Sequence, residues 1–303
     1  MEVQCDVVVI GAGAAGLTAG IYLRRSNLKA VVLEKSAPGG ILLNIHRIDN
    51  YPGLPRIAGP DLAVNMMQQA LDLGVEIAYE EVAKVEKEER HFVVYASNVY
   101  RAKAIIVASG MTQNEKKVPG EKEFLGKGVS YCASCDGAFF RGQDVMVVGH
   151  SDRVAEEAIY LSGLARKVYV AMPEAPSFSE RHADILKGLS QVELMPSTTL
   201  VAVSGTDKVS EAVLSVNGQE TRVPVSAVFP LTEGRSAVSF LYPLHPGEEK
   251  GFLLVDGNLS TSVPGVFACG DVVKKALRQV ANAVGEAALA ATNAIRYVRT
   301  LGK

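Results

Sequence analysis

The residues most able to do chemistry form the segment Cys132-Ala133-Ser134-Cys135-Asp136, in which two cysteines are separated by two residues. A cysteine pair at this spacing can close a small disulfide. The disulfide can accept two electrons and pass them on when one of its thiolates attacks another disulfide. The spacing therefore predicts a redox centre.

A zinc site is the alternative for a close cysteine pair, and it needs a second pair of Cys or His residues at metal-ligand spacing. The histidines are scattered and form no ligand motif; they are His46, His91, His150, His182 and His245. The other cysteines, Cys5 and Cys269, are interpreted as small buried hydrophobic residues. The sequence favours redox chemistry, and no metal site is predicted.

Composition places this redox pair in an ordinary globular protein of 303 residues, long enough for two domains. Hydrophobic residues make up 48% and charged residues 21%, which predicts large packed cores. A net charge of -2 and the lack of an apolar run of about 18 residues predict binding to neither nucleic acid nor membrane. The first residues do not resemble a signal peptide, so a cytoplasmic location is expected.

A glycine-rich turn near the N-terminus joins elements in the order of a dinucleotide-binding unit. Cys5–Ile10 is a predicted buried strand, Gly11–Gly16 turns into a helix, and Ala30–Leu33 is the next strand, ending at Glu34. The glycines allow a tight turn, a close approach of backbone to a pyrophosphate, and close packing of helix on strand. Glu34 can accept hydrogen bonds from a ribose. This unit alone does not distinguish FAD from NAD.

A C-terminal segment favours FAD. Residues 261–271 form a predicted strand that ends in Gly270-Asp271. This segment resembles the second flavin motif of flavoproteins with two dinucleotide-binding domains, in which the Asp contacts the ribityl chain. The alternative for Asp271 is a turn or capping residue, because Gly-Asp is common in turns.

A second βαβ pattern begins at Asp144, with a strand at Val145–Val148, a helix at Asp152–Leu161 and a strand at Lys167–Ala171. The fold class expected is α/β, with two Rossmann-like domains, each a doubly wound three-layer structure. The second domain is inserted in the first. The expected ranges are 1–112 with 244–303 for the FAD-binding domain and 113–243 for the domain that carries the cysteine pair.

Together these motifs resemble the low-molecular-weight thioredoxin reductases over nearly the whole chain. The segments that carry the resemblance are Gly11–Gly16, Asn50–Gly53, Val107–Gly110, Cys132–Asp136, Gly265–Asp271 and Leu277–Gln279. The resemblance implies bound FAD, thioredoxin as the acceptor, a homodimer, and a hinge that lets the cysteine pair visit both the flavin and the partner protein.

The resemblance also assigns roles to residues. Cys135 would lie next to the flavin, Cys132 would attack the disulfide of thioredoxin, and Asp136 would act as acid and base for the thiols. An N-capping role for Asp136 is an alternative that is compatible with catalysis. The residues expected at FAD are Gly11, Gly13, Ala14, Ala15, Gly16, Glu34, Lys35, Gly40, Asn50, Val82, Ser109, Gly110, Gly270, Asp271, Arg278, Gln279 and Val280.

The chain departs from this family where the nicotinamide cofactor should bind. In the turn Val148–Val154 only Gly149 of the glycine fingerprint remains, Ser151 adds a Cβ, and Asp152 adds a negative charge that Arg153 could compensate.

The segment that follows the predicted strand Lys167–Ala171 also departs from the family pattern. It contains no basic residue before Arg181 to hold a 2′-phosphate, and Glu174 has the wrong sign unless it accepts a ribose hydroxyl. The stretch Phe229–Arg235 also differs from the family. A role for NAD(P)H is therefore doubtful.

The leading hypothesis is a flavin-dependent thioredoxin reductase that takes electrons from reduced ferredoxin, as in a branch of the family that lacks nicotinamide motifs. The alternatives are an NAD(P)H-dependent reductase with a diverged site, a disulfide oxidoreductase with another ligand such as a second flavin in that site, and a non-enzymatic FAD-bound redox sensor. Basic residues that could dock an acidic ferredoxin, or could simply be solvated, are Lys116, Lys117, Lys122, Lys127 and Arg141.

Overall fold

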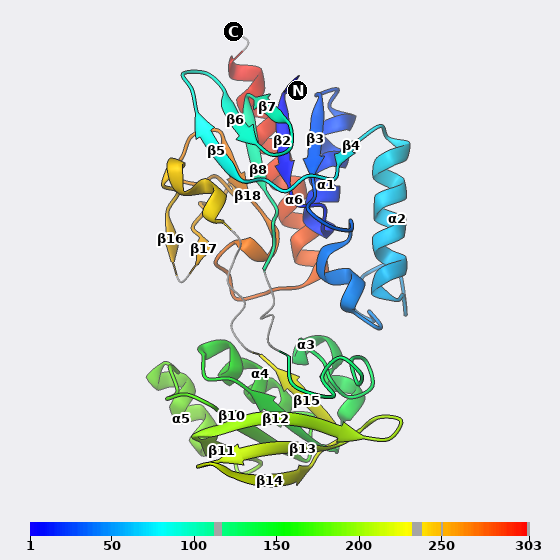
Figure 1. The fold of residues 1–303 in the computed structure, drawn as a ribbon, viewed down its shortest axis with the longest axis vertical. Coiled ribbons are helices and arrows are strands. Elements are labelled where there is room, and N and C mark those ends of the chain that lie inside the picture. Colours follow the sequence, from blue (N-terminus) through cyan, green and yellow to red (C-terminus); the bar gives the residue numbers. More distant parts are fainter. Residues whose placement is uncertain (112–116, 232–237, 250, 302–303) are drawn as a thin grey trace. The chain divides into compact units, whose positions relative to one another are not determined.

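The computed structural model describes residues 1–111, 117–231, 238–249 and 251–301. The chain divides into two compact units (Figure 1), one made of Met1–Thr112 with Arg235–Lys303 and the other of Gln113–Gly234. The second unit is thus inserted in the sequence of the first. No helix of the described ranges combines the length and the apolar character needed to cross a membrane.

The first unit is built on a five-stranded parallel sheet. Its strands, in spatial order, are β18 (Val266–Ala268), β8 (Ala104–Val107), β2 (Val7–Ile10), β3 (Ala30–Leu33) and β4 (Glu76–Ala78). Every residue of β2, β3 and β8 is buried, which is why each strand reads as an unbroken apolar run.

Successive residues of β2 enter two different cores, because side chains alternate along a strand. Val7 and Val9 pack with the helices α1 (Ala14–Arg25), α2 (Gly59–Asp72) and α6 (Val280–Leu301). Val8 and Ile10 pack with a second sheet on the opposite face. The strands of that sheet are β1 (Glu2–Gln4), β7 (Val99–Ala102), β6 (Phe92–Tyr95) and β5 (Lys84–Lys87).

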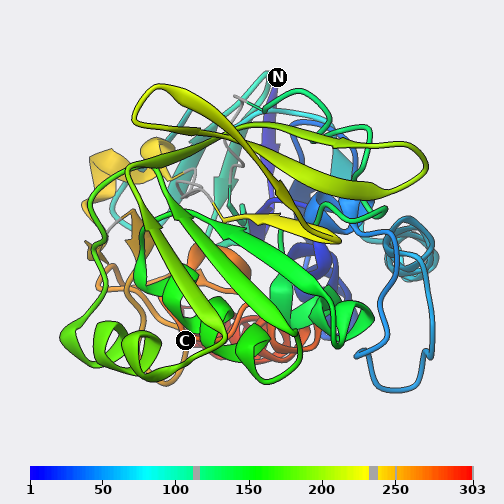
Figure 2. The same cartoon turned by 90° about the horizontal axis from the view of Figure 1, so that it is seen from below.

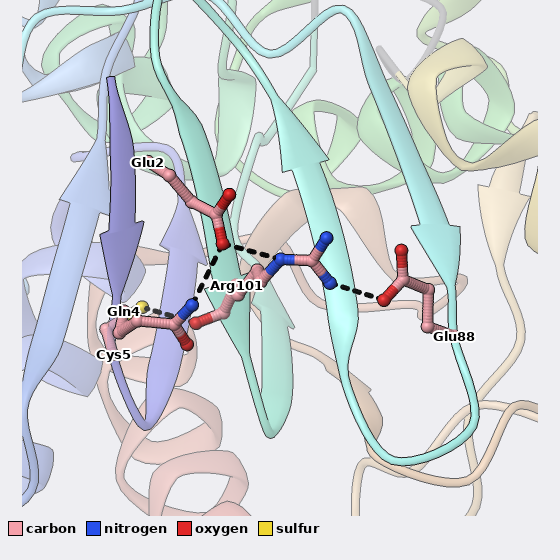
Figure 3. Close-up of polar contacts among 5 residues, drawn as sticks. All are labelled: Glu2, Gln4, Cys5, Glu88 and Arg101. Carbon is pink, nitrogen blue, oxygen red and sulfur yellow. Dashed lines mark hydrogen bonds and ion pairs between the residues drawn. The ribbon is translucent and has the colours of Figure 1, made fainter.

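Polar contacts run across this second sheet, from β1 to the residue that follows β5 (Figure 3). Arg101 Nε donates to Glu2 Oε1 at 2.7 Å, and the same guanidinium pairs with Glu88. The Cys5 thiol donates to the Arg101 carbonyl at 3.6 Å, and burial raises the pKa of Cys5 to about 12. Cys5 is thus an inert thiol, and the ion pairs are exposed enough to contribute little stability.

The second unit is also three-layered. Its parallel sheet has the order β11 (Val192–Pro196), β10 (Lys167–Met172), β9 (Asp144–Val148) and β15 (Ala227–Pro230). Val145 and Val147 of β9 face the core formed with α4 (Asp152–Ser162) and α5 (Glu180–Gly188).

An antiparallel sheet covers the opposite face of these parallel strands (Figure 2). Its strands are β12 (Thr198–Gly205), β13 (Val209–Val216) and β14 (Gln219–Pro224). Met146 and Val148 of β9 pack against it. The predicted α/β class with two doubly wound units is confirmed.

The second boundary lies earlier in the chain than the expected one at 243/244. Val238, Phe240 and Leu241 are buried in the core of the first unit, and the last two belong to the short helix η3 (Ser239–Leu244). Apolar side chains of this segment therefore assign it to the first unit. Strands β16 (Glu248–Glu249) and β17 (Phe252–Leu253) follow it.

Candidate active site

Two glycines of the first turn are required by the protein's own packing. Gly11 has a φ of +103°, and a Cβ there would lie 2.4 Å from the Ala108 carbonyl oxygen. A Cβ on Gly16 would lie 1.7 Å from the Gly11 carbonyl oxygen. Contacts this short are impossible, so α1 can begin directly above β2 only if both positions are glycine.

Gly13 is different, because nothing in the protein requires its lack of a side chain. Its backbone is extended, with φ -72° and ψ -173°, and among the described residues other than its chain neighbours no atom lies within 4 Å of the place its Cβ would occupy. Gly13 therefore keeps open the space in front of the N-terminus of α1, whose first N–H groups attract an anion. The pyrophosphate of FAD fits this arrangement. Ala14 and Ala15, the first residues of α1, are buried below it.

Glu34 holds the turn from the end of β3. Its carboxylate accepts hydrogen bonds from the Ala12 N–H at 2.8 Å and the Ser36 N–H at 2.9 Å. Each carboxylate oxygen has two lone-pair sites, so Glu34 keeps capacity to accept from a ribose hydroxyl. Lys35, the next residue, is exposed.

A second pair of glycines packs on the first turn. The Gly39 N–H donates to the Ala12 carbonyl at 2.8 Å. A Cβ on Gly40 would lie 3.4 Å from the Gly13 Cα. Gly40, which begins the short helix η1 (Gly40–Asn44), therefore lies beside the proposed pyrophosphate position.

The second flavin motif lies against the same helix start. Gly270 has a φ of +75°, and its Cβ would lie 3.0 Å from the Ala15 Cβ. The Gly270 N–H donates to Glu286 Oε2 at 2.9 Å, and Glu286 also pairs with Lys275. Asp271 follows at the start of the short helix η4 (Gly270–Val272). Tertiary folding thus brings together glycines that are more than half the chain apart in sequence.

Four further predicted FAD residues, all in the first unit, are Ser109, Gly110, Asn50 and Gln279. A Cβ on Gly11 would also lie 3.0 Å from the Ser109 Cα, so the Ser109-Gly110 turn after β8 adjoins the glycine turn. Asn50 Nδ2 donates to Gln279 Oε1 at 2.9 Å.

Three more of these residues are placed as follows. Arg278 stacks over the Phe252 ring at 4.4 Å, Val280 is the first residue of α6, and Val82 packs on the core beside β5.

The redox centre lies in the second unit. Cys132 and Cys135 are joined by a disulfide with a Cα–Cα distance of 5.3 Å. The Cys135 N–H donates to the Cys132 sulfur at 3.2 Å, and Cys132 is the N-cap of the one-turn helix α3 (Ala133–Asp136). Asp136 ends α3 and precedes the short helix η2 (Gly137–Phe140). The structure thus contains the disulfide that the cysteine spacing predicts.

Two side chains of α4 hold this segment, and sequence reasoning missed one of them. Arg153 Nη2 donates to the Tyr131 carbonyl at 3.0 Å, so Arg153 is turned to the redox segment. Glu157 Oε2 accepts from the Ser134 N–H at 2.8 Å. The spacing of four residues places both on one face of α4. That spacing is visible in the sequence, but the segment facing it is not.

The turn after β9 is bound by the protein's own chain. The Ser177 N–H donates to the His150 carbonyl at 2.8 Å. Asp152 Oδ1 accepts from the Ser179 N–H at 2.7 Å and contacts His182 Nδ1 at 2.8 Å. These hydrogen bonds, above all the one from the Ser179 N–H, lower the pKa of Asp152. The negative charge that looked misplaced for a phosphate site therefore holds the segment between β10 and α5 against this turn.

Other residues singled out in the sequence are placed as follows. Glu174 lies 3.7 Å from His150 Nε2. Lys117 lies over the Tyr131 ring at 5.0 Å, whereas Lys122, Lys127 and Arg141 are exposed. Lys116 and residues 232–235 lie outside the described residues. Among the described residues, no three His, Cys, Asp or Glu side chains gather as a metal site would require.

Comparison with known proteins identifies the family. A family model described as "Pyridine nucleotide-disulphide oxidoreductase" matches residues 5–287. The thioredoxin reductase of Treponema pallidum is 40% identical, with 99% of each chain covered. The chain belongs to the low-molecular-weight thioredoxin reductases of this family.

Solved structures agree with this assignment. A thioredoxin reductase from Streptococcus pyogenes has a TM-score of 0.92 at 36% identity, covering 99% of this chain and 100% of that one. A ferredoxin-flavin thioredoxin reductase from Clostridium acetobutylicum has a TM-score of 0.56 at 28% identity, covering 99% and 100%. The chain is therefore a flavoprotein oxidoreductase with a redox-active Cys132–Cys135 disulfide, and its family implies FAD.

The two kinds of glycine in the first turn make a testable contrast. Gly13→Val should leave the fold intact and lower FAD retention at least about tenfold, because the added side chain fills the space kept for the pyrophosphate. Gly16→Ala should instead destabilise the protein by about 3 kcal/mol or more, because the Cβ overlaps a carbonyl. The flavin-to-protein absorbance ratio and thermal unfolding of the flavin-free proteins measure the two effects. A Gly13→Val protein that retains wild-type FAD would contradict the assignment.

The Asp152 contacts predict a pH-dependent contribution to stability. The lowered pKa of Asp152 means that its stabilisation is present above the ordinary Asp range and is lost as pH falls through the lowered value. Asp152→Ala should therefore lower unfolding free energy near pH 7 by up to about 1 kcal/mol, a small effect because the side chain is partly exposed. The difference from wild type should vanish near pH 2. A difference that persists at that pH would mean that the charge is not its cause.

Proposed function

We propose that this protein is a thioredoxin reductase of the cytoplasm that receives electrons from reduced ferredoxin and passes them through FAD and the Cys132–Cys135 disulfide to thioredoxin. Thioredoxin is the acceptor indicated by the relatives' names. Ferredoxin is the donor named in one related structure. Dimerisation of two chains is part of this proposal and is measurable by light scattering.

The observation that carries the choice of donor is the state of the second nucleotide turn. Both turns accept a backbone hydrogen bond from a later segment, from Gly39 to Ala12 in the first unit and from Ser177 to His150 in the second. They differ at the next two positions, where Gly13 and Ala14 of the first unit are replaced by Ser151 and Asp152, and the Asp152 carboxylate accepts from the Ser179 N–H. Gly149 keeps a positive φ, of +141°, as Gly11 does, and Ser151 is extended as Gly13 is, but Ser151 carries a side chain. A dinucleotide bound at the second turn would bring its phosphates to a helix start that carries the Ser151 side chain and the Asp152 carboxylate.

Energetics permit ferredoxin as the donor. Plant-type ferredoxins have potentials near about -400 mV and thioredoxin near about -270 mV. The difference of about 130 mV corresponds to roughly 6 kcal/mol for two electrons, so transfer is favourable. FAD, when bound, accepts electrons one at a time and delivers them in pairs, which matches a one-electron donor to a disulfide.

The residues of the redox segment would then act in sequence. Two electrons and two protons convert the disulfide to the Cys132 and Cys135 thiols. The Cys132 thiolate attacks one sulfur of the thioredoxin disulfide, forming a mixed disulfide and releasing a thioredoxin thiolate. The Cys135 thiolate then attacks the Cys132 sulfur, which re-forms the internal disulfide and releases reduced thioredoxin. Asp136 would hold and return the protons that these steps move.

The donor can be tested by anaerobic reduction of the purified flavoprotein. Reduced ferredoxin should bleach the flavin absorbance rapidly, whereas NADPH and NADH at millimolar concentration should bleach it at least about a hundredfold more slowly, because the second turn presents the Ser151 side chain and the Asp152 carboxylate to the phosphates. A thioredoxin reductase that uses NADPH serves as the positive control for the nicotinamides. Fast bleaching by either nicotinamide would favour the alternative, a conventional reductase with a diverged site, which the family description supports.

The order of the two cysteines can be tested separately. Cys132→Ser should still allow flavin reduction but lose thioredoxin reduction by at least about a thousandfold, because the attacking sulfur is gone. Cys135→Ser should instead trap a mixed disulfide between Cys132 and thioredoxin, visible as a mass increase on a non-reducing gel. Retained turnover by Cys132→Ser would remove this residue from the attacking role.

A further inference from the structure

Glu157 is a partly buried carboxylate that faces the redox segment from the neighbouring helix α4. Its Oε2 accepts the Ser134 N–H at 2.8 Å. One helical turn earlier, Arg153 donates to the Tyr131 carbonyl at 3.0 Å. Helix α4 therefore binds the backbone on both sides of Cys132, with a positive group on one side and a negative group on the other.

Glu157 lies in partly buried surroundings, where its charge acts strongly on nearby groups. Burial raises the pKa of its carboxyl group, and the nearby Arg153 charge counters that rise. A carboxylate in poorly solvated surroundings acts on neighbouring groups more strongly than one in water. The group that Glu157 binds, the Ser134 N–H, belongs to the backbone that joins the two cysteines.

The hydrogen bond to Glu157 uses one backbone N–H of α3, the helix that Cys132 caps. The Cys135 N–H donates to the Cys132 sulfur at 3.2 Å, and the Ser134 hydroxyl lies 3.4 Å from it. N–H groups directed at a sulfur stabilise its thiolate. The preceding N–H, that of Ser134, is given to Glu157 instead.

We propose that Glu157 is a positioning residue that disfavours the thiolate of the reduced pair, because it takes the Ser134 N–H and places a negative charge at the backbone between the two cysteines. The reduced pair then becomes a stronger reductant. Stabilising the reduced form makes a dithiol pair a strong oxidant, and destabilising it has the opposite effect. This inference rests on the proposed function, in which the pair must give electrons to thioredoxin.

The test is the equilibrium between the disulfide and dithiothreitol in the full-length, FAD-loaded protein at pH 7. In that reaction dithiothreitol gives two electrons and two protons to the pair and becomes a cyclic disulfide. Acid quenching, alkylation and mass spectrometry of the peptide containing Cys132 and Cys135 give the reduced fraction. Because neither ferredoxin nor thioredoxin is present, this result and the donor test can fail independently.

Two variants separate charge from hydrogen bonding. Glu157→Gln keeps an oxygen for the Ser134 N–H but removes the charge, and it should raise the equilibrium constant for reduction about fivefold. Glu157→Ala also releases the Ser134 N–H and should raise that constant by about tenfold or more, equivalent to about 30 mV. In both variants the alkylation rate of reduced Cys132 at pH 7 should rise severalfold.

The matched control is Glu156→Gln, which removes a carboxylate from an exposed position on the same helix. It should leave both readouts within about twofold of the wild type, because solvent screens its charge. Thermal unfolding and FAD content verify that each variant is folded, and the conservative Gln variant keeps the test open if the Ala variant does not fold. Equilibrium constants within twofold of the wild type in a folded Glu157→Gln protein, or a lower constant, would overturn the proposal.

Discussion

The contact on which the FAD site depends is the approach of the α1 backbone to the turn after β2. Gly16 and the Gly11 carbonyl are so close that any side chain at residue 16 would overlap that carbonyl. This approach aligns the N-terminus of α1 with the end of the parallel sheet, where its unpaired N–H groups can meet a phosphate. Gly40 and Gly270 then pack around this helix start, so the site is a consequence of close backbone packing.

The second unit repeats the same strand–turn–helix frame, with different residues at its turn. The frame is held by β9, whose alternating side chains enter two cores, one shared with α4 and one with the antiparallel sheet. At the turn, the Ser179 N–H donates to the Asp152 carboxylate, a side chain that has no counterpart at Ala14 of the first turn. The same architecture therefore presents different side chains at its two turns.

Helix α4 binds two other segments of this unit. Its N-terminal Asp152 holds the segment that follows β10, and Arg153 and Glu157 hold the backbone around the disulfide. One helix thus joins the altered nucleotide turn to the redox centre.

The sequence by itself determined the α/β class, the principal strands, the Cys132–Cys135 redox pair and the glycine turn, because each is encoded in short-range spacing or in unbroken apolar runs. It did not determine where the second unit ends. Phe240 and Leu241 are assigned to the first unit only because they pack in its core, beside β5. Nor did it reveal the roles of Asp152 and Glu157, whose partners lie more than twenty residues away. Only the tertiary structure decides such contacts, because a charged side chain does not specify which backbone group will meet it.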